Sequence, residues 1–336
     1  MAIAYAAAVN ELARVGPVRR PGPAPGVARP VILDCDPGHD DALAIALALA
    51  SPRLRVLGIT TVAGNAPLER TTRNALRTLT LLGRADVPVA PGAARPLLRD
   101  SQRSVEFHGE SGLDGADLPE PGAEPLGDGA ISFMASAVRG VPDPVTLIPT
   151  GPLTNVALFL RAYPRLVDQV AAIALMGGST AEGNTTASAE FNIWQDPEAA
   201  RIVFESGIPI LMAGLDVTHK ALILPEDIER MAGLGNRTGR VFADLMRFFA
   251  IHHRDRYGWD GPPVHDAVAV AMVAAPHLVE RRPVRVDVET GDGPTRGRTV
   301  ADWEGISGRP PNAEVGLDLD RPAFVDLIVD ALASYP

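Results

Sequence analysis

The sequence predicts an α/β protein with an open, mostly parallel, Rossmann-like sheet that carries helices on both faces. Two observations support this prediction. Short apolar runs such as "PVILDCD" and "RVLGITTVAGN" are rich in β-branched residues, which is typical of strands buried on both faces. Longer helical segments follow these runs, and the alternation of strand and helix recurs along the chain, as it does in proteins with a parallel sheet.

The expected elements of the first two thirds follow in order. The first strand, over 30–36, precedes an Ala- and Leu-rich helix that stops at Pro52. A second strand over 55–65 precedes a helix that ends in Gly83. Further strands are expected within the apolar runs at 145–155, 170–179 and 208–218, with helices over 156–167 and 196–207 between them.

In the last third of the chain, the sequence predicts two helices, a small antiparallel C-terminal addition and a final helix. Helical segments cover 237–258 and 265–276. The segments "RPVRVDVETGDG", "TRGRTVADWEG" and "AEVGLDLD" then have the composition of short antiparallel strands. A final helix is expected over 322–335.

The sequence predicts a flexible N-terminal extension over 1–28, followed by one domain over 29–336. Arginines follow the apolar run of this extension instead of preceding it, which argues against a secretory signal. Residues 96–130 are rich in Gly, Pro and acidic residues, and a loop of this length inside a compact domain is usually functional or mobile.

The composition excludes several classes of protein. The chain has 336 residues and a net charge of −10, with no basic stripe, so nucleic acid is not an expected partner. No apolar run reaches the roughly 18 residues that a membrane span needs. Cys35 is the single cysteine, which rules out an intrachain disulfide and fits a reducing, cytoplasmic compartment.

Four aspartates lie within eight residues at the end of the first strand: Asp34, Asp36, Asp40 and Asp41. Like charges this close repel one another unless a positive charge lies among them. Helix capping by Asp40 or Asp41 is one explanation, but it needs only one side chain. A hard divalent cation explains more, because Ca²⁺ takes six to eight oxygen ligands. Asp36 and Asp41 are the carboxylate ligands that we expect.

Other polar residues follow later strands. Since ligands of open parallel sheets bind beyond the carboxyl ends of the strands, these residues are expected to converge there. Alone, Asn65 or Asn155 could cap a turn, Asp266 could cap its helix, and His265 could be a structural histidine. Together, the residues suit a polyhydroxylated ligand above a metal. They are Asn65, Thr150, Asn155, Asn184, Glu190, Asn192, His265 and Asp266.

With these motifs in view, the chain resembles a known family. The segments "DCDPGHDDALA", "TTVAGN", "HGESGLDG", "PTGPLTN", "AEFN" and "VHDAVAVA" resemble, in this order, those of the nucleoside hydrolases, the inosine–uridine-preferring ribohydrolases. The resemblance runs from about Pro30 to Pro336. It implies the nucleoside hydrolase fold, one bound Ca²⁺, and hydrolysis of the N-glycosidic bond of ribonucleosides to free base and ribose.

The resemblance also implies roles for individual residues. The Ca²⁺ ligands would be Asp36, Asp41, the backbone carbonyl of Thr150, and Asp266. Asp36 would also be the general base for the attacking water, and His265 would protonate the leaving base. His108 would face the base or the 5′ side. The ribose hydroxyls would be held by Asp40, Asn65, Asn184, Glu190 and Asn192.

Aromatic and histidine residues near the end of the helix over 237–258 are candidates for contact with the base of the nucleoside. Tyr257 and Trp259 could stack on it or pack a helix end. His252 and His253 could contact the base or lie on the surface, and we interpret them as surface residues. The resemblance further implies a small-molecule ribonucleoside substrate, a homodimer or homotetramer, and a place in nucleoside catabolism and purine or pyrimidine salvage. The preferred base stays open.

Two other functions remain as alternatives. A Mg²⁺ phosphohydrolase would also place two aspartates, here Asp34 and Asp36, at the end of a first strand, but it needs a lysine against the phosphate, and Lys220 is the only lysine. A nucleoside- or ribose-binding protein without catalysis would need no acidic metal site, so the presence of Asp36, Asp41 and Asp266 together argues against it.

Overall fold

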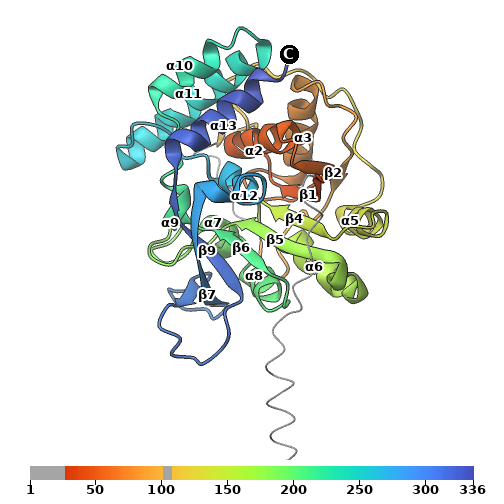
Figure 1. Cartoon of the computed structure of the whole chain (residues 1–336), viewed down its shortest axis with the longest axis vertical. Coiled ribbons are helices and arrows are strands. Elements are labelled where there is room, and N and C mark those ends of the chain that lie inside the picture. Colours follow the sequence, from red (N-terminus) through yellow and green to blue (C-terminus); the bar gives the residue numbers. More distant parts are fainter. Residues whose placement is uncertain (1–26, 101–107) are drawn as a thin grey trace, which may run out of the picture.

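The computed structural model describes residues 27–100 and 108–336, so the N-terminal extension predicted over 1–28 lies almost wholly outside the described residues. The described chain forms one nine-stranded sheet with helices on both faces (Figure 1). This confirms the predicted α/β class. No helix in the described ranges combines the length and the apolar character that a membrane span requires.

The strands are ordered β3-β2-β1-β4-β5-β6-β9-β7-β8 across the sheet. The pairings from β3 through β9 are parallel. The strands span Arg29–Cys35 (β1), Leu54–Thr61 (β2), Val89–Pro91 (β3), Val145–Pro149 (β4), Val170–Met176 (β5), Ile210–Ala213 (β6), Val279–Val288 (β7), Thr299–Asp302 (β8) and Ala313–Leu319 (β9).

The helices cover the sheet in two layers. In Figure 1, α2, α3, α11 and α13 lie on one side of the sheet, and α5, α6 and α8 lie on the other. The α-helices are His39–Ala50 (α2), Leu68–Leu81 (α3), Ala130–Arg139 (α5), Thr154–Ala162 (α6), Phe191–Gln195 (α7), Pro197–Phe204 (α8), Leu215–Thr218 (α9), Pro225–Ala232 (α10), Arg237–Tyr257 (α11), His265–Ala274 (α12) and Arg321–Ala333 (α13). Short 3₁₀ helices span Pro164–Gln169 and Pro276–Leu278.

Strand β1 shows why this sequence forms a central strand. Successive side chains of a strand point to opposite faces, and here every residue from Pro30 to Cys35 is buried. Val31 and Leu33 pack in the core under α2 and α12, whereas Ile32 packs in the core under α5 and α6. Neighbouring strands β2 and β4 both pair with β1. The chain therefore reverses its order across the sheet between β1 and β4, which is where α/β proteins bind ligands.

The C-terminal strands add a feature that the sequence pattern did not predict. β7 pairs antiparallel with β8 and with β9, as expected for a small antiparallel addition. β9 also pairs in parallel with β6, so the addition continues the main sheet instead of forming a separate layer. Residues 109–129 contain no helix or strand, in agreement with the loop expected over 96–130.

Candidate active site

A cavity opens beyond the carboxyl ends of β1, β4 and β5. It is lined by polar side chains from distant parts of the chain and by a set of aromatic rings. Lining residues foreseen from the sequence are Asp40, Asn65, His108, Thr150, Asn184, Glu190, Asn192, Tyr257, Trp259, His265 and Asp266. Lining residues that the sequence did not single out include Met176, Phe191, His219 and Phe249.

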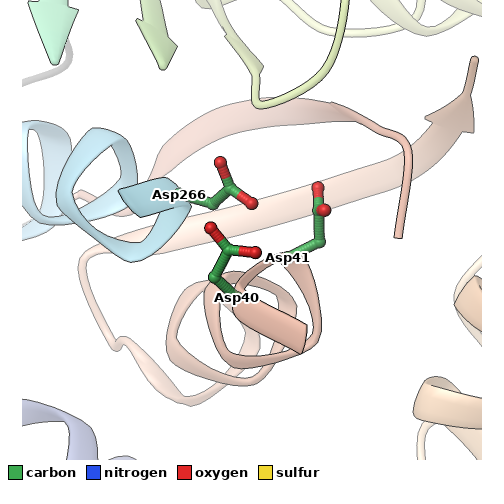
Figure 2. Close-up of side chains that lie close together, drawn as sticks. All are labelled: Asp40, Asp41 and Asp266. Carbon is green, nitrogen blue, oxygen red and sulfur yellow. The ribbon is translucent and has the colours of Figure 1, made fainter. Parts of the chain in front are cut away.

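Three buried carboxylates meet at the floor of this cavity. Figure 2 shows Asp40 and Asp41 on the first turn of α2 facing Asp266 on the first turn of α12. One oxygen from each of the three carboxylates lies within 4.8 Å of the others. The residues are 0–5% exposed, so water does not screen their mutual repulsion well.

Asp41 combines a structural and a site role. Its Oδ2 accepts a hydrogen bond from the backbone N–H of Gly38 over 3.0 Å, which caps the N-terminus of α2. Its Oδ1 accepts from the hydroxyl of Thr150 over 2.7 Å, which ties α2 to the end of β4. The capping explanation thus holds for Asp41, but it does not account for Asp36, Asp40 or Asp266.

Asp36 lies directly after β1, beside this group of three. Its Oδ2 accepts from the backbone N–H of Asn65 over 2.7 Å, whereas its Oδ1 is buried with no hydrogen-bond partner in the described part of the chain. Gly64 and Gly151 flank the carboxylate so closely that a Cβ atom on Gly151 would lie 2.5 Å from Oδ1, and one on Gly64 would overlap Oδ2. Both glycines therefore make room for Asp36.

Burial and mutual repulsion change the protonation of these carboxylates. Burial, and then the charge of Asp41, raise the pKa of Asp40 to about 7. The pKa values of Asp36 and Asp266 rise well above the usual range, again through burial first and neighbouring carboxylates second. The pKa of Asp41 is raised by burial. A cation among these oxygens would remove the repulsion and hold all four ionised.

The donor set fits a hard divalent cation. Asp36, Asp41 and Asp266 offer buried carboxylate oxygens, and the unpartnered Oδ1 of Asp36 leaves one ligand position unused by the protein. The backbone carbonyl of Thr150 is held in place by the side-chain amide of Asn192, which donates to it over 2.7 Å. An all-oxygen set of carboxylates and carbonyls selects Ca²⁺ or Mg²⁺ over softer metals.

A second group of polar residues follows β5. Glu190 begins α7 as its N-cap, and its carboxylate accepts from the backbone N–H groups of Gly178, Asn192 and Ile193. Burial nevertheless raises the pKa of Glu190 to about 7. The side-chain oxygen of Asn184 accepts from the backbone N–H of Phe191, which ties the preceding loop to the same helix.

Histidines and aromatic rings form the opposite wall. Nδ1 of His265 lies 2.8 Å from the hydroxyl of Thr218, and burial lowers the pKa of His265 well below its usual value. Tyr257 and Trp259 stack with ring centroids 4.6 Å apart. The assignment of His253 to the surface was wrong. It is buried on the cavity side of α11, where its ring stacks on Trp259 at 6.0 Å.

Asp34 and Asn155 lie outside the cavity. The side-chain amide of Asn155 donates to Oδ1 of Asp34 over 2.8 Å, and the hydroxyl of Thr60 donates to the same oxygen over 2.6 Å. The expectation that Asn155 faces the ligand crevice is therefore wrong, because its side chain joins β1, β2 and the start of α6 below the site. A buried hydrogen bond of this kind cannot be read from one polar residue after a strand.

Comparisons with known proteins agree with this fold and site. Residues 31–326 match the profile of the family described as inosine-uridine preferring nucleoside hydrolase. A pyrimidine-specific ribonucleoside hydrolase, RihA, of Citrobacter koseri is 52% identical over 310 residues, 92% of this chain and 99% of that one. The RihA of Escherichia coli is 51% identical over 92% of this chain and all of its own.

A solved purine-preferring ribonucleoside hydrolase from Gardnerella vaginalis superimposes with a TM-score of 0.86 at 34% identity and covers 91% of this chain and 98% of its own. A plant nucleoside hydrolase gives a TM-score of 0.84 at 31% identity, over 92% of this chain and all of its own. The class that the fold and the site define is a hydrolase of N-glycosyl compounds. The chain belongs to the inosine-uridine preferring nucleoside hydrolase family.

Proposed function

We propose that this enzyme hydrolyses the N-glycosidic bond of ribonucleosides in a Ca²⁺-dependent reaction and that it prefers pyrimidine bases. The observation that carries the proposal is the group of buried carboxylates at the floor of a cavity lined by amide, carboxylate and imidazole groups. The pyrimidine preference is supported by the relatives at 50–52% identity that are named pyrimidine-specific, although the solved neighbour at 34% identity is named purine-preferring.

The lining of the cavity supports an uncharged nucleoside as the substrate. None of the described residues that line the cavity is a lysine or an arginine, whereas Asp40, Glu190 and Asp266 are acidic. A nucleoside phosphate would bring negative charge against these carboxylates without a cationic side chain to balance it. The same reasoning argues against the phosphohydrolase alternative, and Asp34, its required nucleophile, is fully buried beneath the site.

Asp36, Asp41, the carbonyl of Thr150 and Asp266 would hold the Ca²⁺. When bound there, the ion would supply positive charge that lowers the pKa of a nearby water and orders the ribose hydroxyls. The carboxylates themselves bring a strong negative potential to the place where the sugar becomes an oxocarbenium-like cation, and this potential stabilises the transition state.

Asp36 is the general base in this proposal. Its Oδ1 makes no hydrogen bond to the described protein, so the two lone pairs of this oxygen remain for the ion and for the proton of the attacking water, while Asn65 fixes the other oxygen. One water attacks the anomeric carbon opposite the leaving base, and the configuration inverts. Asp40, Asn65, Asn184, Glu190 and Asn192 orient the ribose, and four of these side chains are already fixed by hydrogen bonds.

The leaving base is handled by the aromatic wall. Tyr257 and Trp259 present stacked rings to the cavity and can stack on a planar base. His265 carries the proton to the base in this proposal, with its ring oriented by Thr218. Because burial lowers the pKa of His265, its ring holds an added proton weakly; a proton taken up from solvent as the bond breaks would pass readily to the leaving base and leave a neutral imidazole.

A substrate panel tests the proposed function. Uridine, cytidine, inosine, adenosine and guanosine are incubated with the enzyme and CaCl₂, and free ribose is measured. We expect release from uridine and cytidine with kcat/KM at least ten-fold above that for inosine. Tight binding without release would support the binding-protein alternative, and release only from purine nucleosides would overturn the pyrimidine preference.

The proposal extends to the compartment and the assembly of the enzyme. The single cysteine suits a reducing compartment, and the family resemblance supports a cytoplasmic homodimer or homotetramer in nucleoside catabolism and base salvage. Light scattering on the purified enzyme measures the oligomeric state, and a mass of one chain would exclude both assemblies.

A further inference from the structure

We infer that Thr299 and Asp216 are positioning residues that hold the segment 178–180, which in turn fixes the carboxylate of Glu190 in the cavity. The contact of Glu190 with the ribose rests on the proposed function, whereas the positioning of its carboxylate follows from contacts within the structure. Neither Thr299 nor Asp216 lines the cavity, and neither takes part in the proposed reaction.

Glu190 receives one of its hydrogen bonds from the segment 178–180. Its carboxylate accepts from three backbone N–H groups, of which those of Asn192 and Ile193 belong to its own helix α7. The third N–H group, that of Gly178, lies 2.9 Å from Oε2 and belongs to the segment that follows β5. The bond from Gly178 therefore joins the carboxylate directly to the end of a central strand.

Thr299 holds the middle of this segment with a single hydroxyl group. Its Oγ1 accepts from the backbone N–H of Ser179 over 2.8 Å and donates to the backbone carbonyl of the same residue over 2.6 Å. A hydroxyl can make both bonds because it is a donor and an acceptor at once. Both residues are at most 4% exposed, so water cannot easily replace these bonds if the hydroxyl is removed.

The side chain of Thr299 also packs directly against Gly178. The φ angle of Gly178 is +76°, in the left-handed region that favours glycine. A Cβ atom on Gly178 would lie 2.9 Å from both Oγ1 and Cγ2 of Thr299, and 2.6 Å from the side chain of Met212. Thr299 therefore limits how far the N–H group of Gly178 can turn away from Glu190.

Asp216 holds the far end of the segment from α9. Its Oδ2 accepts from the backbone N–H of Thr180 over 2.9 Å, and its Oδ1 accepts from the hydroxyl of Thr180 over 2.6 Å. The neighbouring backbone N–H of Leu215 donates to the carbonyl of Gly178 over 2.9 Å. The segment is therefore bonded to both β8 and α9, two elements that come later in the chain.

Steady-state kinetics on uridine and cytidine test the role of Thr299. Thr299→Val keeps the shape of the side chain but removes the hydroxyl. Because Glu190 orients the ribose and does not cleave the bond, we expect KM to rise about ten-fold, the effect of one lost hydrogen bond, with little change in kcat. Thr299→Ser keeps the hydroxyl and should restore most of the affinity.

Thr295→Val is the control, because it makes the same exchange at an exposed threonine and should leave both constants unaltered. An unaltered KM in Thr299→Val, or a fall in kcat alone, would overturn the inference. No rescue by Thr299→Ser would show that the hydroxyl is not what matters, with the same consequence.

Thr180→Val tests the contact with Asp216 and replaces Thr299→Val if that variant does not fold. Thr180 is only partly buried, and the variant keeps the bond from its backbone N–H to Asp216. We expect KM to rise by about three-fold at constant kcat, since one of two bonds is lost. A KM equal to that of Thr295→Val would contradict the role of Asp216.

Hydrogen exchange without substrate tests the positioning independently of activity. Mass spectrometry should show faster exchange in Thr299→Val at the segment 178–180 and at the start of α7, with a smaller increase in β5. An equal increase in all three would show a general loss of stability and would overturn the inference. If the unaltered enzyme releases no base from any nucleoside but exchange at α7 responds as expected, the proposed function fails and the positioning of Glu190 stands.

Discussion

The side-chain amide of Asn192 donates a hydrogen bond of 2.7 Å to the backbone carbonyl oxygen of Thr150. This bond joins the start of α7 to the end of β4, two segments that the sequence separates by 42 residues. Since the same carbonyl is a proposed ligand of Ca²⁺, one amide group aligns a metal ligand and reaches into the ribose side of the cavity at once.

Replacing Asn192 should therefore affect both substrate and ion. In Asn192→Ala, the carbonyls of Thr150 and Met176 lose a donor, at a cost of about 1–3 kcal/mol. We expect KM for uridine to rise at least ten-fold, with a smaller loss in kcat, and the Ca²⁺ concentration for half-maximal activity to rise. Steady-state kinetics across a calcium titration measure all three. Unaltered KM and calcium dependence would contradict both roles.

Asp36→Asn should remove the general base while keeping the shape of the side chain. We expect kcat to fall by about 10²–10⁴-fold, the usual contribution of general base catalysis. Asp34→Asn is the matched control, with the same change two residues earlier, at a side chain held by Thr60 and Asn155 away from the cavity. It should keep most of the activity. Loss of phosphatase activity in Asp34→Asn alone would support the phosphohydrolase alternative.

Gly64→Ala tests the space that Asp36 requires. The added methyl group would overlap Oδ2 of Asp36, so we expect the carboxylate to rotate, kcat to fall at least a hundred-fold, and stability to fall by about 1–3 kcal/mol. Gly127→Ala is the control, because a Cβ atom at Gly127 meets nothing within 4 Å. Equal activity of the two variants, measured on uridine, would refute the role assigned to Gly64.

Removal of divalent cations should lower both activity and thermal stability. The carboxylates of Asp36, Asp40, Asp41 and Asp266 repel one another in the folded chain, and an ion that binds only the folded state stabilises it. At a hundred-fold excess over Kd the gain is about 2.7 kcal/mol. Calorimetry with EGTA, and then with added CaCl₂ or MgCl₂, measures it. If the melting temperature is the same with and without EGTA, the protein does not bind a stabilising metal ion.

The pH dependence of stability should reflect His253. Burial lowers the pKa of His253 to about 4, below the roughly 6.5 of the unfolded chain. The unfolded state therefore takes up the proton first, so the stabilisation present above pH 6.5 is lost as pH falls towards 4. His253→Phe cannot take up this proton. Relative to the unaltered protein, it should gain roughly 3 kcal/mol between pH 6.5 and 4.

Urea unfolding at several pH values measures this difference, and the exposed His277→Phe variant provides the control. Comparing variant with unaltered protein cancels the opposite contribution of the buried carboxylates, whose raised pKa values favour the folded state at low pH. A constant difference over the whole range would show that His253 has the same pKa in the folded and the unfolded protein.

The central strands of the fold could be predicted because their apolar sequence pattern agrees with their burial in the folded protein. Apolar runs such as β1 and β5 are buried on both faces, and each breaks at a Pro or Gly turn that carries the site. The parallel pairing of β9 with β6 could not be predicted, because three amphipathic strands in sequence look the same whether they stand alone or extend a larger sheet.

Some residues of the candidate site could also be predicted from the sequence, and others could not. Carboxylates and amides next to strand ends, such as Asp41 and Asn192, could be found because the ends of parallel strands converge. His253, His219 and Phe249 could not, because they lie on or after helices whose rotation about their axes decides which side chains face the cavity. The helical spacing of Phe249 and His253 was the available signal, since residues four apart share a face.

The position of β9 has a consequence for synthesis of the protein. As the chain leaves the ribosome, β6 and β7 both emerge before the strand that lies between them, so their facing edges stay unpaired until residues 313–319 arrive. A nascent chain interrupted before that point would expose two unpaired strand edges, through which it could associate with other chains. We expect chaperones to be needed to prevent this association.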